Sequence, residues 1–177
     1  MIFVLAYPTF EPAVARSIDA FRQLHEPDRA TLVRPYVTLV FGVRSLSSAA
    51  LCSICDRVLK DQPPIDISLI GQEVVHDPFE QTYKLMLTVG VGAELLQHLR
   101  QRLYDGPHRH EWRSDRPYRA HVTVGTNTSR SRLDNLDLAE IGVIPIPATI
   151  RSVEVVALEK GALKLLRDFP LQEKFGR

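Results

Sequence analysis

The sequence predicts a duplicated, bilobal α+β fold, in which two antiparallel sheets meet at a central cleft with helices outside. The order strand, helix, strand, helix fills the first quarter of the chain, and a related order surrounds a second short β-branched run near residue 121. Extended runs that resemble hairpins lie between and after these units, as in antiparallel sheets with segregated helices. We therefore expect residues 1–177 to form one bilobal domain.

The elements of the first half follow from the spacing of apolar residues. Residues 2–7 predict a strand, and residues 11–24 repeat apolar side chains at three- and four-residue steps, as an amphipathic helix does. Residues 25–35 are rich in charge and proline, predict a loop, and lead into a strand over 36–43. The serines at 45–48 are residues that begin helices, so a helix is expected from about Ala49 to Lys60.

The second half shows a similar alternation. Residues 64–75 and 81–89 are extended runs around a turn-like spacer and predict an antiparallel pair. Residues 93–106 predict a strongly amphipathic helix that ends at Gly106. A strand at residue 121 and a short polar segment follow, and two final runs around Gly161 predict a terminal hairpin.

Two short runs place polar residues at equivalent strand positions. In the run from Pro117 to Asn127, His121 and Thr123 fall on one face of a strand, because successive side chains alternate between faces. In the earlier run RPYVTLVFGV, Tyr36 and Thr38 occupy the corresponding positions. The residues expected to point to the core are Val122 and Val124 in the later run, and Val37, Leu39, Phe41 and Val43 in the earlier one. The leading position is therefore histidine in one run and tyrosine in the other.

The composition is that of an ordinary soluble protein. Hydrophobic residues make up 45% of the chain and charged residues 24%, which excludes a disordered or fibrous class. A net charge of +1 gives no general attraction to nucleic acid. No run approaches the roughly 18 apolar residues of a membrane span, and the apolar start of the chain lacks the basic flank of a signal peptide. We expect a cytoplasmic monomer that does not contact membranes.

The cysteines and the paired histidines do not predict a metal or redox centre. Cys52 and Cys55 fall in the middle of a predicted helix, away from the helix start where the dipole lowers a thiol pKa, and this favours buried small side chains. His108 and His110 lack a further set of ligands at suitable spacing. We expect both histidines in solvent, and no metal.

With these residues in view, the chain resembles the 2H phosphoesterases, also called 2′-5′ RNA ligase-like or LigT-like proteins. The family has two H-x-T/S motifs, one in each lobe of a bilobal fold, and the resemblance covers roughly residues 1–170. His121-Val122-Thr123 fits the second motif. Tyr36-Val37-Thr38 stands where the first is expected, and Ala120 replaces a proline that often precedes the second.

The resemblance implies a reaction and the residues for it. In this family the two histidines activate water and protonate the leaving oxygen at a phosphoryl centre, without a cofactor, and two threonines donate hydrogen bonds to its oxygens. The implied substrates are 2′,3′-cyclic phosphates of RNA ends or small nucleotides. His121, Thr123, Thr38 and Tyr36 then take the catalytic positions. Because a phenol stays protonated at neutral pH and is a poor base, we expect slow turnover, and an inactive module that binds nucleotides or RNA ends is the alternative.

An arginine-rich segment before the second motif is the expected contact for the substrate. Arg116 and Arg119 are predicted to bind phosphate. Trp112 and Tyr118 are predicted to stack against a base. For any single arginine, a solvated loop with local ion pairs is the alternative.

Overall fold

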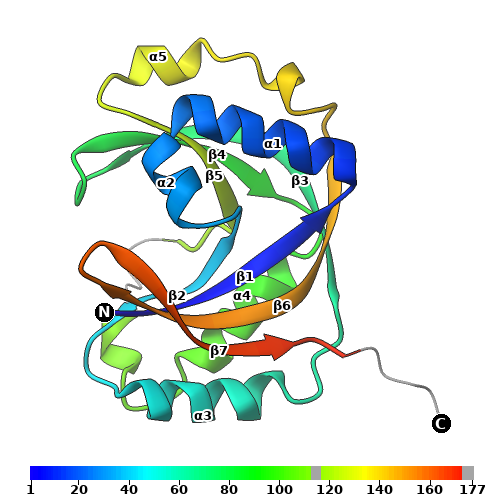
Figure 1. Ribbon diagram of the computed structural model, residues 1–177. Coiled ribbons are helices and arrows are strands. Elements are labelled where there is room, and N and C mark those ends of the chain that lie inside the picture. Colours follow the sequence, from blue (N-terminus) through cyan, green and yellow to red (C-terminus); the bar gives the residue numbers. More distant parts are fainter. Residues whose placement is uncertain (113–116, 173–177) are drawn as a thin grey trace, which may run out of the picture.

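The computed structural model describes residues 1–112 and 117–172 of the chain (Figure 1). The strands are β1 (Ile2–Phe10), β2 (Val37–Val43), β3 (Ile65–Asp77), β4 (Thr82–Val89), β5 (His121–Asn127), β6 (Ile146–Glu159) and β7 (Ala162–Pro170). The helices are α1 (Pro12–His25), α2 (Pro27–Leu32), α3 (Ser48–Leu59), α4 (Ala93–Leu103) and α5 (Arg130–Asp134). The strands and helices predicted from apolar spacing are present close to their expected bounds.

The strands form one antiparallel sheet in the order β2-β1-β6-β3-β4-β5, with β7 also paired to β6. The first part of β6 pairs with β3, where Ile150 lies opposite Ile65, and the later part pairs with β7, where Glu154 lies opposite Asp168. The two predicted sheets are therefore halves of one sheet, joined at β6. We call β1, β2, β7 and the later part of β6 the β2 half, and β3, β4 and β5 the β5 half.

Helices cover the outer faces of both halves, as the sequence predicted. In Figure 1, α1 and α5 lie over the β5 half, and α3 and α4 lie against the β2 half. The Glu11 carboxylate caps the first turn of α1, and the Ser47 hydroxyl caps that of α3. Cys55 is buried and Cys52 half-buried on α3, and both are free thiols. Within the two described ranges, no helix has the length and apolar character needed to cross a membrane.

Part of the predicted loop between α1 and β2 is a helix. The charge and proline of residues 25–35 suggested irregular structure, but Pro27 occupies the first turn of α2, where a missing N–H costs nothing. The helix is short, and its residues are not fully buried. Its local sequence therefore carries little of the periodicity by which longer helices are recognised.

Phe41 does not point to the core as predicted, because β2 contains a bulge. Val4 of β1 lies opposite Val40, whereas the next residue, Leu5, lies opposite Thr38, so β2 has one extra residue at this point. The extra residue reverses the alternation beyond it. Val40 is consequently buried and Phe41 is 56% exposed, with its ring edge-on to Phe3.

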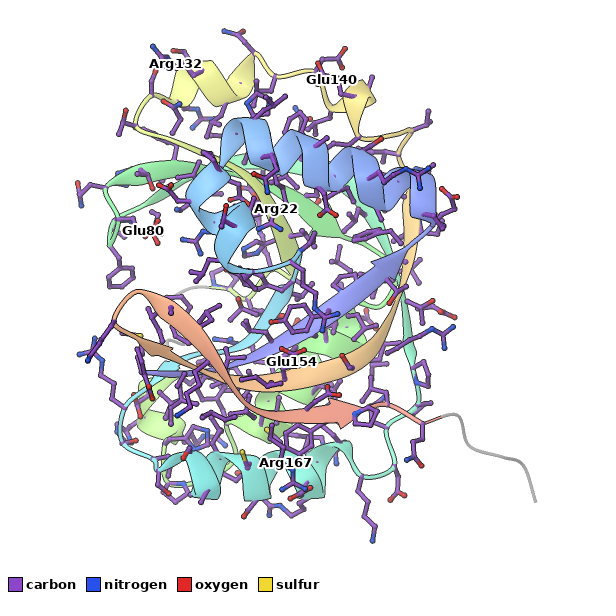
Figure 2. The ribbon with its side chains drawn as sticks, in the orientation of Figure 1. Arg22, Glu80, Arg132, Glu140, Glu154 and Arg167 are labelled. Atoms are coloured by element: carbon purple, nitrogen blue, oxygen red, sulfur yellow. The ribbon has the colours of Figure 1, made fainter. Side chains whose placement is uncertain are left out.

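A buried ion pair lies between α1 and the β5 half. The Arg22 Nε donates a hydrogen bond to Glu26 Oε1 over 2.6 Å, and both side chains are almost fully buried. Figure 2 shows Arg22 on the side of α1 that faces the sheet. Burial raises the pKa of Glu26, against the opposing hydrogen bond and charge of Arg22. Because both side chains are buried, water cannot take the place of either partner when the other is removed.

We predict that Glu26→Ala lowers the free energy of unfolding by about 3–5 kcal/mol, because Arg22 would remain buried without its counter-charge. The measurement is urea denaturation followed by circular dichroism. Asp134→Ala is the matched control, since it also removes an i,i+4 partner, but of the exposed Arg130. That change should cost less than about 1 kcal/mol. Similar losses of unfolding free energy in the two variants would contradict a stabilising role specific to the buried Arg22–Glu26 pair.

Candidate active site

The two edges of the sheet meet, and each edge strand belongs to one of the two motif runs. β2 and β5 are at opposite ends of the strand order, yet they contact each other. The Tyr118 hydroxyl, just before β5, donates a hydrogen bond of 3.0 Å to the Thr38 carbonyl on β2. The sheet therefore curls until the run at 36–38 lies near the run at 121–123.

The alternation predicted for β5 is confirmed. Val122 and Val124 are fully buried, while His121 and Thr123 are half-buried on the opposite face. On the neighbouring strand, Met86 lies opposite Thr123. The two valines anchor the strand in the core, and the histidine and threonine face the inner side of the curled sheet.

A backbone carbonyl fixes the tautomer of His121. Nδ1 lies 2.7 Å from the Arg119 carbonyl oxygen, which can only accept a hydrogen bond. Nδ1 therefore carries a proton, and in the neutral ring the lone pair is on Nε2. Burial lowers the pKa of His121, although the Arg119 carbonyl and the Glu73 carboxylate act in the opposite direction. A neutral imidazole with Nε2 as the basic atom is suited to accept a proton near neutral pH.

Tyr36 and Thr38 are also half-buried and share one face, with Val37 between them in the core. The Tyr36 ring packs against a small apolar cluster on the inner side of the β2 half, formed by Leu5, Tyr7, Val33 and Val156. Its hydroxyl oxygen accepts a hydrogen bond of 3.0 Å from the Arg29 guanidinium on α2. Sequence reasoning missed Arg29, because it lies in the segment taken for a loop.

Side chains from α4 and the segment after it cover the open edge of β2. Arg100 donates a hydrogen bond of 2.9 Å to the Leu39 carbonyl, and the Phe41 N–H donates one of 3.1 Å to the Tyr104 hydroxyl. The guanidinium of Arg100 lies over three aromatic rings, those of Tyr118, Tyr104 and Trp112, at 4.7, 4.9 and 5.6 Å from their centroids. Arg100 was not predicted, because nothing in α4 alone indicates a contact with an edge strand.

The residues predicted to bind the substrate have partners in the structure. Tyr118 and Trp112 pack around Arg100, and they also line a cavity of about 840 Å³ beside α4 that includes Arg102. The exposed Arg119 makes a 2.7 Å ion pair with Glu73, a residue that the sequence did not single out. Arg116 lies outside the described residues. Base stacking and phosphate binding by these side chains remain predictions.

The paired histidines differ from the expectation in one respect. His110 is exposed, as predicted, but His108 is fully buried, and its ring stacks on that of Tyr104 at 5.4 Å between centroids. The prediction of a solvated His108 was wrong because the loop folds back onto the end of α4. Among residues 1–112 and 117–172, no three His, Cys, Asp or Glu side chains are grouped so that they could hold a metal ion.

Comparisons with known proteins identify a family and a fold. The sequence model of the 2′-5′ RNA ligase superfamily matches residues 10–162. TT0787 of Thermus thermophilus aligns with a TM-score of 0.61 and 17% identity over 97% of this chain and 99% of that one. E. coli LigT complexed with 3′-AMP gives 0.57 and 16% over 97% and 98%, and Usb1 of Kluyveromyces marxianus gives 0.58 and 12% over 96% and 97%. The search of curated proteins gave no match.

We predict that the pKa of His121 lies below its ordinary value of 6.5, and that Glu73→Gln lowers it further by removing a charge that favours the imidazolium. NMR titration of the ring resonances measures both. Because the unfolded chain binds this proton more tightly, the contribution of His121 to the free energy of unfolding falls as the pH drops below about 6.5. Glu94→Gln, at an exposed position on α4, is the control. If the pKa of His121 is the same in wild type and in Glu73→Gln, the Glu73 carboxylate does not act on this histidine.

Proposed function

Because the chain belongs to the 2′-5′ RNA ligase superfamily, we propose that it is a phosphoesterase that opens 2′,3′-cyclic phosphates of RNA ends or small nucleotides. The proposal rests on one observation above all, the state of His121. Its neutral ring has Nε2 as the basic atom, and it shares the inner face of β5 with Thr123. The strand of Thr38 is in contact with this edge.

The solved relatives support a nucleotide ligand. E. coli LigT has been crystallised with 3′-AMP, a nucleotide phosphomonoester, and also with ATP and with phosphate. These ligands belong to that protein, which has the same fold as this chain. An RNA end or a small cyclic nucleotide is therefore the ligand class that we propose here.

The proposed reaction is the hydrolysis of one phosphodiester bond. Water attacks the phosphorus atom and gives its proton to Nε2 of His121. The bond from phosphorus to one ribose oxygen breaks, and that oxygen takes a proton from the Tyr36 hydroxyl. Thr38 and Thr123 donate hydrogen bonds to the other phosphoryl oxygens, where negative charge increases in the transition state. The product is a phosphomonoester, and the step uses no cofactor. Loss of the proton from His121 to solvent and uptake of a proton by the Tyr36 phenolate restore the starting state.

We propose that the hydrolysis is slow because the acid at position 36 is a tyrosine and not a histidine. A phenol releases its proton less readily than an imidazolium ion, so it protonates the leaving oxygen less effectively. A positioned acid or base typically contributes about 10²- to 10⁴-fold to a rate. Tyrosine at this position is also the observation that favours the second candidate, a module on the same fold that binds nucleotides or RNA ends and does not turn them over.

We predict that His121→Ala lowers turnover of 2′,3′-cyclic nucleotides and of a short RNA with a cyclic phosphate end by about 10²-fold or more. The measurement is product formation by chromatography. His110→Ala is the matched control, because Nδ1 of this exposed histidine also contacts a backbone carbonyl, that of Pro107, at 3.0 Å. It should retain wild-type turnover. Nucleotide binding without turnover in the wild type would favour the binding module.

We predict that Tyr36→His raises turnover, by up to about 10²-fold, because an imidazolium is a stronger acid than a phenol at this position. The rate constant kcat on the best substrate of the panel is the measurement. Tyr36→Phe is the control, since it keeps the ring and removes the hydroxyl, and its kcat should fall below that of wild type. No gain in Tyr36→His would indicate that the inner face has been remodelled for a different ligand.

A further inference from the structure

Arg29 connects Tyr36 to the other half of the sheet. Its Nη1 donates to the Tyr36 hydroxyl oxygen over 3.0 Å, and its Nη2 donates to Glu80 Oε1 over 2.6 Å. Glu80 lies 51 residues further along the chain, between β3 and β4. Figure 2 shows Glu80 at the end of this hairpin. One guanidinium therefore bridges the β2 half, which carries Tyr36, and the β5 half, which carries His121.

The Glu80 carboxylate, which binds Arg29, is itself bound by Lys84. Lys84 is almost fully buried, and its ammonium group contacts both the Glu80 carboxylate and, at 3.3 Å, the Thr126 hydroxyl on β5. Partial burial acts against ionisation of Glu80, but the hydrogen bond from Lys84 and the charge of Arg29 hold its pKa below the usual range. Arg29 is thus paired with an ionised carboxylate that is held by Lys84 of β4, and Lys84 in turn contacts the strand of His121.

This arrangement decides what the Tyr36 hydroxyl can do. A guanidinium has only donors, so the phenol oxygen must be the acceptor in its contact with Arg29. The proton of the hydroxyl is then left for a different acceptor. Arg29 and Lys84 carry two positive charges and Glu80 one negative charge, so the three together leave one positive charge beside the phenol, which favours an anionic ligand.

We propose that Arg29, held by Glu80, is a positioning residue that aims the Tyr36 hydroxyl at the phosphoryl group. This inference rests on the proposed function. When Tyr36 gives its proton to the leaving oxygen, negative charge develops on the phenol oxygen, and the hydrogen bond from Arg29 stabilises that charge. The contact is therefore stronger in the transition state than in the ground state, and its loss should lower kcat more than it raises KM.

The test is a double-mutant cycle on hydrolysis of 2′,3′-cyclic AMP with wild type, Arg29→Gln, Tyr36→Phe and the double variant. Arg29→Gln should lower kcat by about 10-fold, by analogy with outer groups that orient metal-binding histidines, with KM changed less than about twofold. In the Tyr36→Phe background the same change should have no measurable effect, because the oxygen through which Arg29 acts is missing. Equal losses in the two backgrounds, or a loss confined to KM, would overturn the proposal.

Two further variants separate positioning from general stability. Arg29→Lys keeps a charged donor and should recover part of the kcat lost in Arg29→Gln. Arg167→Gln removes an exposed arginine that binds Asp56 through two hydrogen bonds of 2.7 Å, on the outer side of the β2 half near α3. It is the control, and it should leave kcat unchanged. Thermal melting of every variant shows whether the fold is intact, and a fall in kcat that follows only the melting temperature would refute positioning.

The outcome for Arg29 can be told apart from the outcome for the proposed function. If the wild type shows no turnover that depends on His121, the phosphoesterase proposal fails. The same cycle is then measured on the dissociation constant of 2′,3′-cyclic AMP by calorimetry. Coupling between Arg29→Gln and Tyr36→Phe in binding would still support positioning of the hydroxyl on the phosphate. Additive effects, or no binding by the wild type, would overturn it.

Discussion

The candidate site depends on the closure of the sheet onto itself. An edge strand exposes backbone N–H and C=O groups that must find partners, and in many proteins it is a site of unwanted pairing. Here side chains supply the partners on the open edge of β2, since Arg100 binds the Leu39 carbonyl, Tyr104 accepts from the Phe41 N–H and Tyr118 binds the Thr38 carbonyl. The Tyr118 contact also holds the strand of Thr38 against the segment that leads into the strand of His121. In this fold, a contact that satisfies the open edge of β2 therefore also brings the two motif strands together.

The two motif positions are supported in different ways. The ring of His121 is oriented by a carbonyl only two residues away, so its support is local and comes with the strand. Tyr36 has a single polar atom, and its orientation depends on Arg29 and, through it, on Glu80 from the other half of the sheet. Tyrosine at this position thus requires long-range contacts that histidine at 121 does not. Substitution of Arg29 or Glu80 therefore acts on Tyr36, whereas the hydrogen bond of His121 to the Arg119 carbonyl involves neither residue.

Sequence reasoning predicted what depends on local periodicity. The strand faces at His121 and Thr123, the long helices and the terminal hairpin follow from patterns that span a few residues. The sequence did not predict α2, the bulge that exposes Phe41, or the joining of the sheets at β6, because each depends on pairing between distant segments. For the same reason it missed Arg29 and Arg100, whose partners are brought near only by the curl of the sheet.

The hydrogen bonds also assign a direction to the proposed reaction. The Arg119 carbonyl leaves neutral His121 with one free ring atom, and that atom can only accept a proton. Arg29 occupies the Tyr36 oxygen as a donor, so that the hydroxyl is left to donate its proton elsewhere. In the proposed hydrolysis the attacking water therefore lies on the β5 side and the leaving ribose oxygen on the β2 side, because in-line displacement places the two on opposite sides of phosphorus. Exchange of these roles would require an imidazolium at His121 and a phenolate at Tyr36, so the two halves of the sheet are not chemically equivalent despite their similar motifs.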